Sequence, residues 1–472
     1  MELTCWFFDT VNMHIFDKSL ALIFSLMILG QAYLVRRYVG TWLFPACLFG
    51  LFWFGLTFVP LLLLLPVPIN PMGSGFILLC LVAFSLSAVL FPWRSSLKAK
   101  TLSGETSAQQ FESSFLKNAF YVLSCFATAL ILMDYLAQGF SLHDLLYDLI
   151  ATAAAYRNLV SFDQLSSTIY GRLGEILIYD VAILGGLIIS STHSWWKRLA
   201  IVSFSFAPGT LMAVAQSTKW ALFSCLAFFY AGLLAYRVAK GDFRLFHRGV
   251  IKKAVPAIAI LALITTVSFM SRGLQGSEDS DLIRDRLRLM FASYTCGHLY
   301  GFSDWYGAYM AANWDTGYQS EIRYQQEDAL HGKTYGLYTF TPLFRFFGST
   351  KVIPPDTFND YYEYGNIMAG NIYTMFRGLI EDFGLVGCLL FMFSMGLLSH
   401  WCFHAMLRNR IQAFGVVAFT FFVGFFYASF GRSLFSWSGI YFTFFLLAAV
   451  LTVNRYVSVP WKLSTSLSEA GT

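Results

Sequence analysis

Charged residues are scarce in this sequence. Only 12% of its 472 residues are Asp, Glu, Lys or Arg, whereas soluble domains carry about 25%. Hydrophobic residues supply 57% of the chain, and 18% of the chain is aromatic. So few charges cannot cover the surface of a soluble protein of this length. The composition therefore excludes a soluble enzyme and a disordered chain, and it predicts an all-α polytopic membrane protein.

Several signatures of known chemistry are also missing. The eight cysteines form no CxxC pair and no disulfide framework. There is no P-loop, HExxH, GxSxG or dinucleotide-binding fingerprint, so ATP-driven transport, zinc proteolysis and hydrolase chemistry have no sequence support. We expect no metal, no cofactor and no nucleic-acid partner. No cationic segment precedes the first apolar run, which indicates that no signal peptide is cleaved.

Long apolar stretches are what the sequence has in abundance, and eleven of them are long enough to be transmembrane helices. They lie near residues 19–36, 42–65, 74–93, 118–137, 174–192, 198–215, 220–236, 254–270, 373–400, 411–430 and 437–453. Pro208 and Gly209 lie inside the sixth stretch. We therefore expect that helix to be broken or partly re-entrant.

The positions of Lys and Arg predict the orientation of the chain. They gather in alternate short loops between the apolar stretches, with few acids beside them. Such loops face the cytoplasm, which places the N-terminus outside and the C-terminus inside. We expect a single integrated membrane domain with three regions: residues 1–270 hold the first eight helices, 271–372 form one large outer loop, and 373–472 hold the last three helices and a cytoplasmic tail.

The two outer loops carry the residues of interest. In the smaller loop, 138–173, leucines recur at helical spacing from Leu142 onward and predict a helix on the membrane surface. The larger loop and its end hold twelve of the 25 tyrosines, between Tyr294 and Tyr373. Tyrosine joins a flat apolar face to a hydroxyl, which suits a sugar. An aromatic belt at the membrane interface is the alternative interpretation.

Arginines at membrane depth predict an anion site. Arg377 lies inside the ninth apolar stretch, where a charge is costly and normally faces a cavity. A guanidinium matches a phosphate bidentately. Pairing with a carboxylate such as Asp382 is the alternative. Further arginine candidates, of which the first follows the eighth stretch directly, are Arg272, Arg157, Arg172 and Arg345.

Acids and one histidine could supply a general base. Glu381 and Asp382 lie just inside the ninth stretch, where either could accept a proton or orient an arginine. His298 is the alternative base, since its ordinary pKa lies near neutral pH. The D-x-D pattern at Asp279–Asp281 is best interpreted as a helix N-terminus rather than a metal site.

Three motifs of this outer region resemble the O-antigen polymerase (Wzy) family of oligosaccharide repeat-unit polymerases. They are Gly297–Trp305, Gly336–Arg345, and N-I-Y-T-M-F-R at Asn371–Arg377 followed by D-F-G at Asp382–Gly384. The third motif is the most specific. The motif similarity covers about residues 270 to 390, and Tyr156 and Arg157 resemble a tyrosine–arginine position of the family. The exit of the sixth stretch, Gln216–Lys219, departs from the glycine- and arginine-rich turn expected there.

The resemblance implies a fold related to the class C glycosyltransferases, in the bacterial inner membrane and with the large loop in the periplasm. Such enzymes move a growing glycan from undecaprenyl pyrophosphate to the terminal sugar of another undecaprenyl-pyrophosphate-linked repeat. The lipid bilayer and a chain-length regulator would be partners. The residues that would carry catalysis are Arg377, Asp382 and His298. Those that would bind substrate are Arg272, Arg157, Arg172, Arg345, Tyr338, Thr339 and Tyr373.

Two other functions remain open at this point. An O-antigen ligase or another surface-polysaccharide polymerase would share the fold and much of the chemistry. A flippase or transporter of lipid-linked oligosaccharides belongs to a different class. Transporters usually place charged residues in paired, repeat-related spans, whereas the apolar stretches here are largely free of charge and show no inverted repeat.

Overall fold

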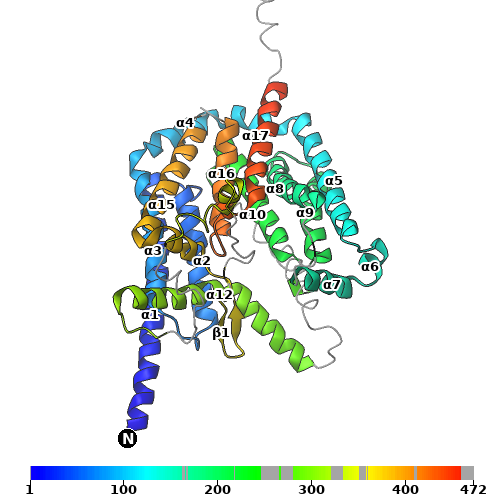
Figure 1. The fold of residues 1–472 in the computed structure, drawn as a ribbon. Coiled ribbons are helices and arrows are strands. Elements are labelled where there is room, and N and C mark those ends of the chain that lie inside the picture. Colours follow the sequence, from blue (N-terminus) through cyan, green and yellow to red (C-terminus); the bar gives the residue numbers. More distant parts are fainter. Residues whose placement is uncertain are drawn as a thin grey trace, which may run out of the picture. The chain divides into compact units, whose positions relative to one another are not determined.

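The computed structural model of the chain is built almost entirely of helices (Figure 1). It describes residues 2–161, 165, 168–216, 218–245, 265–266, 280–319, 333–349, 358, 360–408 and 412–458. The α-helices are α1 (Glu2–Val39), α2 (Pro45–Leu63), α3 (Pro71–Leu86), α4 (Trp93–Ala108), α5 (Ser114–Ala137), α6 (Leu142–Tyr147), α7 (Leu149–Ser161), α8 (Ile169–Ile189), α9 (Trp195–Ala215), α10 (Lys219–Lys240), α12 (Ser280–Trp314), α14 (Thr341–Phe346), α15 (Met375–Leu407), α16 (Gln412–Ala428) and α17 (Ser438–Ser458). The 3₁₀ turns are η1 (Ser87–Leu90), η2 (Gln109–Glu112) and η3 (Leu434–Ser436), and the strands are β1 (Tyr362–Tyr364) and β2 (Met368–Gly370).

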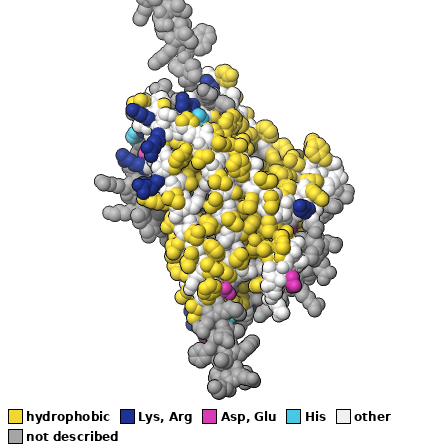
Figure 2. Space-filling model, turned by 90° about the vertical axis from the view of Figure 1, so that its left-hand side faces the viewer, with side chains coloured by type: hydrophobic (Ala, Val, Ile, Leu, Met, Phe, Trp, Pro, Cys, Tyr) yellow, Lys and Arg dark blue, Asp and Glu magenta, His cyan; other side chains and the backbone are white. Residues whose placement is uncertain are grey.

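Among the described residues, eight helices are long and apolar enough to cross a membrane. They are α1, α2, α3 with its η1 extension, α5, α9, α10, α15 and α17. Large apolar side chains such as Leu34, Val122 and Phe445 are exposed along them, and hydrophobic atoms predominate on the face shown in Figure 2. A helix can leave such side chains outside only in contact with lipid. The prediction of a helical, multi-pass membrane protein is confirmed.

The eight helices correspond to eight of the eleven predicted stretches, and the other three differ for separate reasons. The stretch 174–192 forms α8, which is apolar but carries three charged residues, Arg172, Glu175 and Asp180, and therefore falls outside the eight. The stretch 411–430 forms an apolar helix of only moderate length, Ala413–Ala428. The stretch 254–270 lies outside the described residues, apart from 265–266.

The expected break in the sixth stretch is wrong, because α9 runs continuously through Pro208 and Gly209. Pro208 has no N–H to donate to the Phe204 carbonyl one turn earlier. The Ser124 hydroxyl of α5 donates to that carbonyl instead, at 2.6 Å. Gly209 allows α10 to approach, since a Cβ there would lie 2.7 Å from the Cys225 sulfur. A neighbouring helix thus supplies the hydrogen bond that the proline removes.

The chain folds into two compact units whose segments alternate along the sequence. Unit 1 contains Met1–Phe91, Gly276–Trp401 and Phe425–Ser438, and unit 2 contains Pro92–Gln275, Cys402–Gly424 and Gly439–Thr472. In unit 2, α8 packs on α5, α9 and α10. Gly186 and Gly232 allow the closest part of this packing, because a Cβ on either would meet the backbone of the other helix at 2.0 or 2.2 Å.

The two loops that the sequence predicts on the outer side contain more regular structure than expected. The stretch 138–173 forms α6 and α7, which join at Asp148, so the predicted helix is present but divided. In the larger loop, α12 runs for 35 residues from Ser280, where the N-terminal interpretation of the D-x-D pattern places a helix start. The antiparallel β1–β2 hairpin lies against α12 (Figure 1). The Ala369 N–H donates to the Ser293 hydroxyl of α12 at 2.9 Å and fixes this contact.

Candidate functional site

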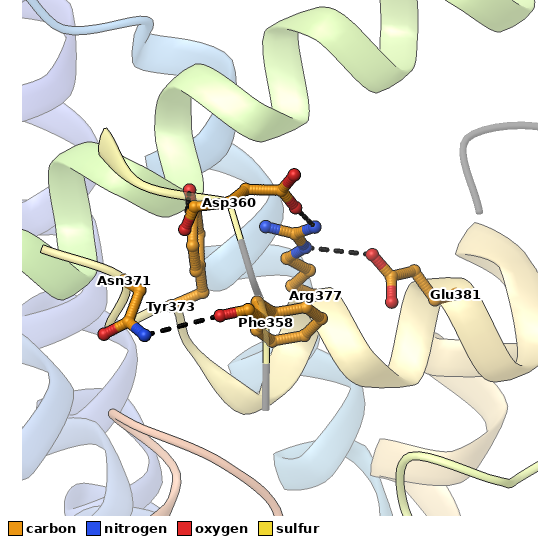
Figure 3. A network of polar contacts seen from close by, with 6 residues as sticks. All are labelled: Phe358, Asp360, Asn371, Tyr373, Arg377 and Glu381. Carbon is orange, nitrogen blue, oxygen red and sulfur yellow. Dashed lines mark hydrogen bonds and ion pairs between the residues drawn. The ribbon is translucent and has the colours of Figure 1, made fainter. Parts of the chain in front are cut away.

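Arg377 is the centre of a buried ion triad in unit 1. It lies in the first turn of α15 and only 1% of its side chain is exposed. Its Nε donates to the Glu381 carboxylate at 2.9 Å, one helical turn later, and its Nη2 donates to the Asp360 carboxylate (Figure 3). Both carboxylates are buried as well. Burying an arginine at this depth is possible because two acids compensate its charge.

Aromatic rings enclose the same guanidinium. Its Cζ lies 3.9 Å from the centre of the Phe358 ring, 4.3 Å from that of Tyr373 and 5.1 Å from that of Trp305. Ring faces attract a cation, and more strongly where water is excluded. The aromatic and ionic contacts together hold Arg377 in one position.

The segment that carries Asp360 is fixed by its own hydrogen bonds. The Asn371 amide lies 3.4 Å from the Phe358 carbonyl, and the Tyr373 hydroxyl lies 3.4 Å from the Asp360 carbonyl (Figure 3). The hairpin between them turns the chain back, so that Asp360 and Tyr373 meet at the start of α15. The triad thereby ties this segment to the helix.

Asp382 anchors a second segment, residues 333–349, to α15. One carboxylate oxygen accepts from the Thr334 hydroxyl at 2.5 Å and from the Tyr338 N–H at 3.0 Å. The other accepts from the N–H and the hydroxyl of Thr339, at 2.7 and 2.6 Å. Because four donors occupy this carboxylate, its geometry is that of a structural anchor and leaves little capacity for a general base.

Gly384 explains why this anchor forms in the middle of a helix. Its φ of 71° and ψ of 177° interrupt α15, and this backbone conformation is almost confined to glycine. The interruption releases the carbonyls of Glu381 and Asp382 from helical hydrogen bonds. They accept instead from the N–H groups of Thr334 and Tyr335, at 3.0 and 3.1 Å. The D-F-G motif therefore encodes a kink that receives the segment 333–349.

The structure brings five of the predicted site residues together: Tyr338, Thr339, Tyr373, Arg377 and Asp382. Tyr338 stacks on Phe358, with ring centres 5.4 Å apart, and Phe358 in turn contacts the Arg377 guanidinium. Burial raises the pKa of the Tyr338 and Tyr373 hydroxyls, so both are protonated donors at neutral pH. The cluster thus combines a cation, carboxylates and phenolic donors.

His298 lies in unit 1 but shows no contact with the triad among the described residues. Its Nε2 lies 3.0 Å from the Leu56 carbonyl, and its ring packs edge-on against Trp53 and Phe430. Burial lowers its pKa to about 4, so the ring is neutral at physiological pH. This apolar setting is that of a packed histidine, and it does not favour the predicted role as base.

No other predicted arginine is found in this cluster among the described residues of unit 1. Arg345 is exposed in α14 of unit 1. Arg157 and Arg172 belong to α7 and α8 in unit 2, and Arg272 lies outside the described residues. Within the part of the chain that the structure describes, no three His, Cys, Asp or Glu side chains are placed to hold a metal ion.

Of the two acids that the sequence offered as partners of an arginine, Glu381 and not Asp382 pairs with Arg377. Asp382 is five residues away and about 140° around the helix, whereas Glu381 at four residues lies on the same face. The spacing alone could have identified Glu381. Asp360, Phe358 and Trp305 gave no such signal, because only the tertiary fold brings them to Arg377.

Comparison of the chain with protein-family models, with curated proteins and with solved structures finds no match. The function is therefore argued from the residues of the site.

Proposed function

We propose that this protein is a glycosyltransferase of the O-antigen polymerase type. It would transfer a growing glycan from undecaprenyl pyrophosphate to the terminal sugar of another undecaprenyl-pyrophosphate-linked repeat, at the periplasmic face of a bacterial inner membrane. In this proposal the stretch 254–270, α8 and Ala413–Ala428 also cross the bilayer. The fold is then of the class C type, with eleven spans, a periplasmic N-terminus and a cytoplasmic C-terminus.

One observation carries the proposal: residues from all three motifs meet at Arg377. Trp305 comes from the first motif, Tyr338 from the second, and Tyr373 from the third. More than 60 residues separate the first and third of these along the chain. A resemblance that rested on chance would not be expected to gather its separate motifs around one side chain.

The reaction needs a charge to meet the leaving group, a base and a surface for sugars. The acceptor hydroxyl attacks the anomeric carbon of the donor glycan. The bond between that carbon and the pyrophosphate oxygen breaks, and the hydroxyl proton passes to a base. Arg377 would stabilise the charge that develops on the pyrophosphate, held in place by Asp360 and Glu381. Tyr338 and Tyr373 would present ring faces and hydroxyl donors to sugars.

Of the three residues that the sequence indicated as a base, Glu381 is a better candidate than Asp382 or His298. Asp382 is occupied by four donors, and His298 packs among apolar rings. Glu381 is buried beside Arg377. A carboxylate in this position can take the proton from the acceptor hydroxyl as its oxygen attacks the anomeric carbon.

The deciding experiment is elongation in vitro. The purified chain in detergent or nanodiscs would receive a lipid-linked repeat unit and no other protein, and products would be resolved by size. We expect a ladder of elongated lipid-linked glycans. Movement of the repeat across a vesicle membrane without elongation would identify a transporter and contradict the proposal. Polymer that accumulates on the carrier lipid when the gene is deleted would identify a ligase.

Two variants connect the activity to the cluster. Tyr338→Phe keeps the stacked ring and removes the hydroxyl, and we expect it to lower the elongation rate at least tenfold, which is about 1.4 kcal/mol of transition-state stabilisation. Tyr361→Phe is the matched control, since Tyr361 is an exposed tyrosine outside the cluster. Equal rates for both variants and the parent protein would remove Tyr338 from the proposed site.

A further inference from the structure

The segment 333–349 exposes large apolar side chains outside any helix that could span a membrane. Phe346 and Phe347 are 83% and 82% exposed, and Tyr335 is 76% exposed. Leu343, one turn before them in α14, is partly exposed. Adjacent phenylalanines this open to the outside are unfavourable in water and favourable at a lipid interface.

The segment lies beside a lipid-facing part of α15. Lys333 approaches Gly384, with its Cε 3.3 Å from where a Cβ would stand. Phe340 packs against Phe391 with ring centres 6.2 Å apart. Between these two contact points, Val386 and Leu390 of α15 are 70% and 61% exposed. The segment therefore sits at the level where the apolar surface of a candidate span begins.

The backbone of the segment is suited to that depth, because many of its N–H groups donate within the protein. Those of Thr334 and Tyr335 donate to carbonyls of α15, and those of Tyr338 and Thr339 donate to Asp382. Further N–H groups donate to carbonyls of the segment itself, and they belong to Leu337, Phe340, Leu343, Phe344, Phe347, Gly348 and Ser349. Irregular backbone is tolerated near the hydrocarbon only when it is satisfied in this way.

The charges of the segment have a single sign. Lys333 and Arg345 are both exposed, and residues 333–349 contain no Asp or Glu. Neither cation forms an ion pair within the described part of the chain. Aromatic side chains flanked by cations complement a layer of lipid phosphates above acyl chains.

We propose that residues 333–349 form a docking surface for the anionic phospholipids of the bilayer, in which Phe346 and Phe347 enter the acyl layer and Lys333 and Arg345 pair with headgroup phosphates. This inference goes beyond the glycosyltransferase proposal, since it concerns the bilayer lipid and not the glycan carrier. It also links the two, because Thr339 and Tyr338 of the docked segment bind Asp382. Lipid docking thus fixes one wall of the Arg377 cluster.

Photocrosslinking in nanodiscs tests the proposal. The full chain carries benzoylphenylalanine in place of Phe346 or Phe347, and the nanodiscs contain phosphatidylcholine with or without phosphatidylglycerol. After irradiation, mass spectrometry identifies what is attached at the substituted position. We expect attached phospholipid, with phosphatidylglycerol favoured over its share in the nanodisc. The assay uses no sugar substrate, so its result is independent of elongation.

Two controls make the result specific. Benzoylphenylalanine at Tyr361, an exposed aromatic position beside the acid Glu363, should attach little or no lipid. Lys333→Gln combined with Arg345→Gln should weaken the preference for phosphatidylglycerol by about 30-fold, since each cation near the surface contributes roughly fivefold. Both side chains are exposed, so this variant should fold normally.

Three outcomes would overturn the proposal. The first is attachment of positions 346 and 347 to another protein or to a second copy of this chain. The second is the absence of attached lipid at both positions in protein that is inserted and folded. The third is attached lipid with no phosphatidylglycerol preference, or with a preference that the Lys333 and Arg345 substitutions leave unchanged.

Discussion

The buried acids of unit 1 and Asp180 of unit 2 lie in different surroundings. In unit 1, the carboxylates of Asp360, Glu381 and Asp382 all accept hydrogen bonds, and two of them pair with Arg377. In unit 2, Asp180 is 1% exposed on α8, and neither of its oxygens has a hydrogen-bond partner among the described residues. Asp134 of unit 2 is also buried, but it accepts from the Thr168 hydroxyl at 2.5 Å and from the Gln216 amide at 2.9 Å. Asp180 is thus a buried acid that lacks the compensation given to the others.

The difference indicates what each acid contributes to the fold. A buried ion pair is costly to break, because the partner left behind remains charged and desolvated. A buried carboxylate without partners leaves nothing behind when it is replaced. We therefore expect the fold of unit 1 to depend on its buried charges and the fold of unit 2 to be indifferent to Asp180.

The largest expected effect comes from breaking the triad. Arg377→Met keeps much of the side-chain volume and leaves Asp360 and Glu381 unpaired, so we expect a destabilisation of about 3 to 5 kcal/mol. Thermal unfolding in detergent would measure it. Arg284→Met is the matched control, because Arg284 pairs with Asp281 at an exposed position and should change stability by less than about 1 kcal/mol.

Two further substitutions distinguish the contribution of charge to the stability of the triad from that of packing. Adding Asp360→Asn and Glu381→Gln to Arg377→Met removes the orphaned charges and should restore part of the lost stability. If Arg377→Met alone unfolds at the parent temperature, or if the added substitutions only destabilise further, the triad is not held by compensation of charge.

The next effect is a pH dependence of stability that comes from His298, a buried residue of unit 1 with no ionic partner in the described residues. Burial lowers the pKa of His298 from 6.5 to about 4, so the unfolded chain binds a proton at this residue before the folded protein does. Stability is therefore complete above about pH 6.5 and falls as the pH drops towards 4, by about 3 kcal/mol for this group.

The His298→Gln variant identifies this contribution. Glutamine keeps a donor for the Leu56 carbonyl and cannot take up a proton in this range. The difference in stability between parent and variant, measured from pH 7.5 to pH 4.5, should move in favour of the variant as the pH falls. A constant difference would show that His298 is not held neutral by burial.

A smaller effect is expected at the kink that presents Asp382. Gly384 has a φ of 71°, and alanine in this conformation costs about 1 to 3 kcal/mol. Gly384→Ala should lower the unfolding temperature and the elongation rate together, since the segment 333–349 depends on the kink. Gly30→Ala is the control: Gly30 lies within α1 with no atom within 4 Å of an added Cβ, and it should be neutral or slightly stabilising. Equal changes in unfolding temperature and elongation rate for the two variants would contradict a role of the kink.

The sequence was informative about lipid-facing elements because their signal is local. An apolar run of sufficient length has few alternatives to a membrane helix, and eight such runs became helices at the expected places. Prediction failed where the outcome depends on a neighbour. Pro208 should interrupt α9 by local rules, but the Ser124 hydroxyl of another helix satisfies the carbonyl that the proline leaves free.

In the candidate site, too, the sequence predicted what depends on local spacing and missed what depends on the tertiary fold. The cost of burying Arg377 was visible from its position in an apolar stretch, and the i to i+4 spacing of Glu381 was available in the sequence. Asp360 was not visible, because a hairpin brings it to Arg377. The four donors of Asp382 were not visible either, because they come from a segment more than 40 residues away. Local spacing thus shows that a charge needs compensation but not which residue provides it.

The smallest expected effect completes the comparison between the units. Asp180→Asn removes a carboxylate whose oxygens have no hydrogen-bond partner among the described residues, so we expect unfolding to shift by less than about 1 kcal/mol. Asp382→Asn is its counterpart in unit 1, where an amide would turn its N–H groups toward donors and cost about 1 to 3 kcal/mol. Thermal unfolding of the two variants side by side measures the contrast. Equal losses would mean that the Asp180 carboxylate has a stabilising partner, and the distinction between Asp180 and the acids of unit 1 would then fail.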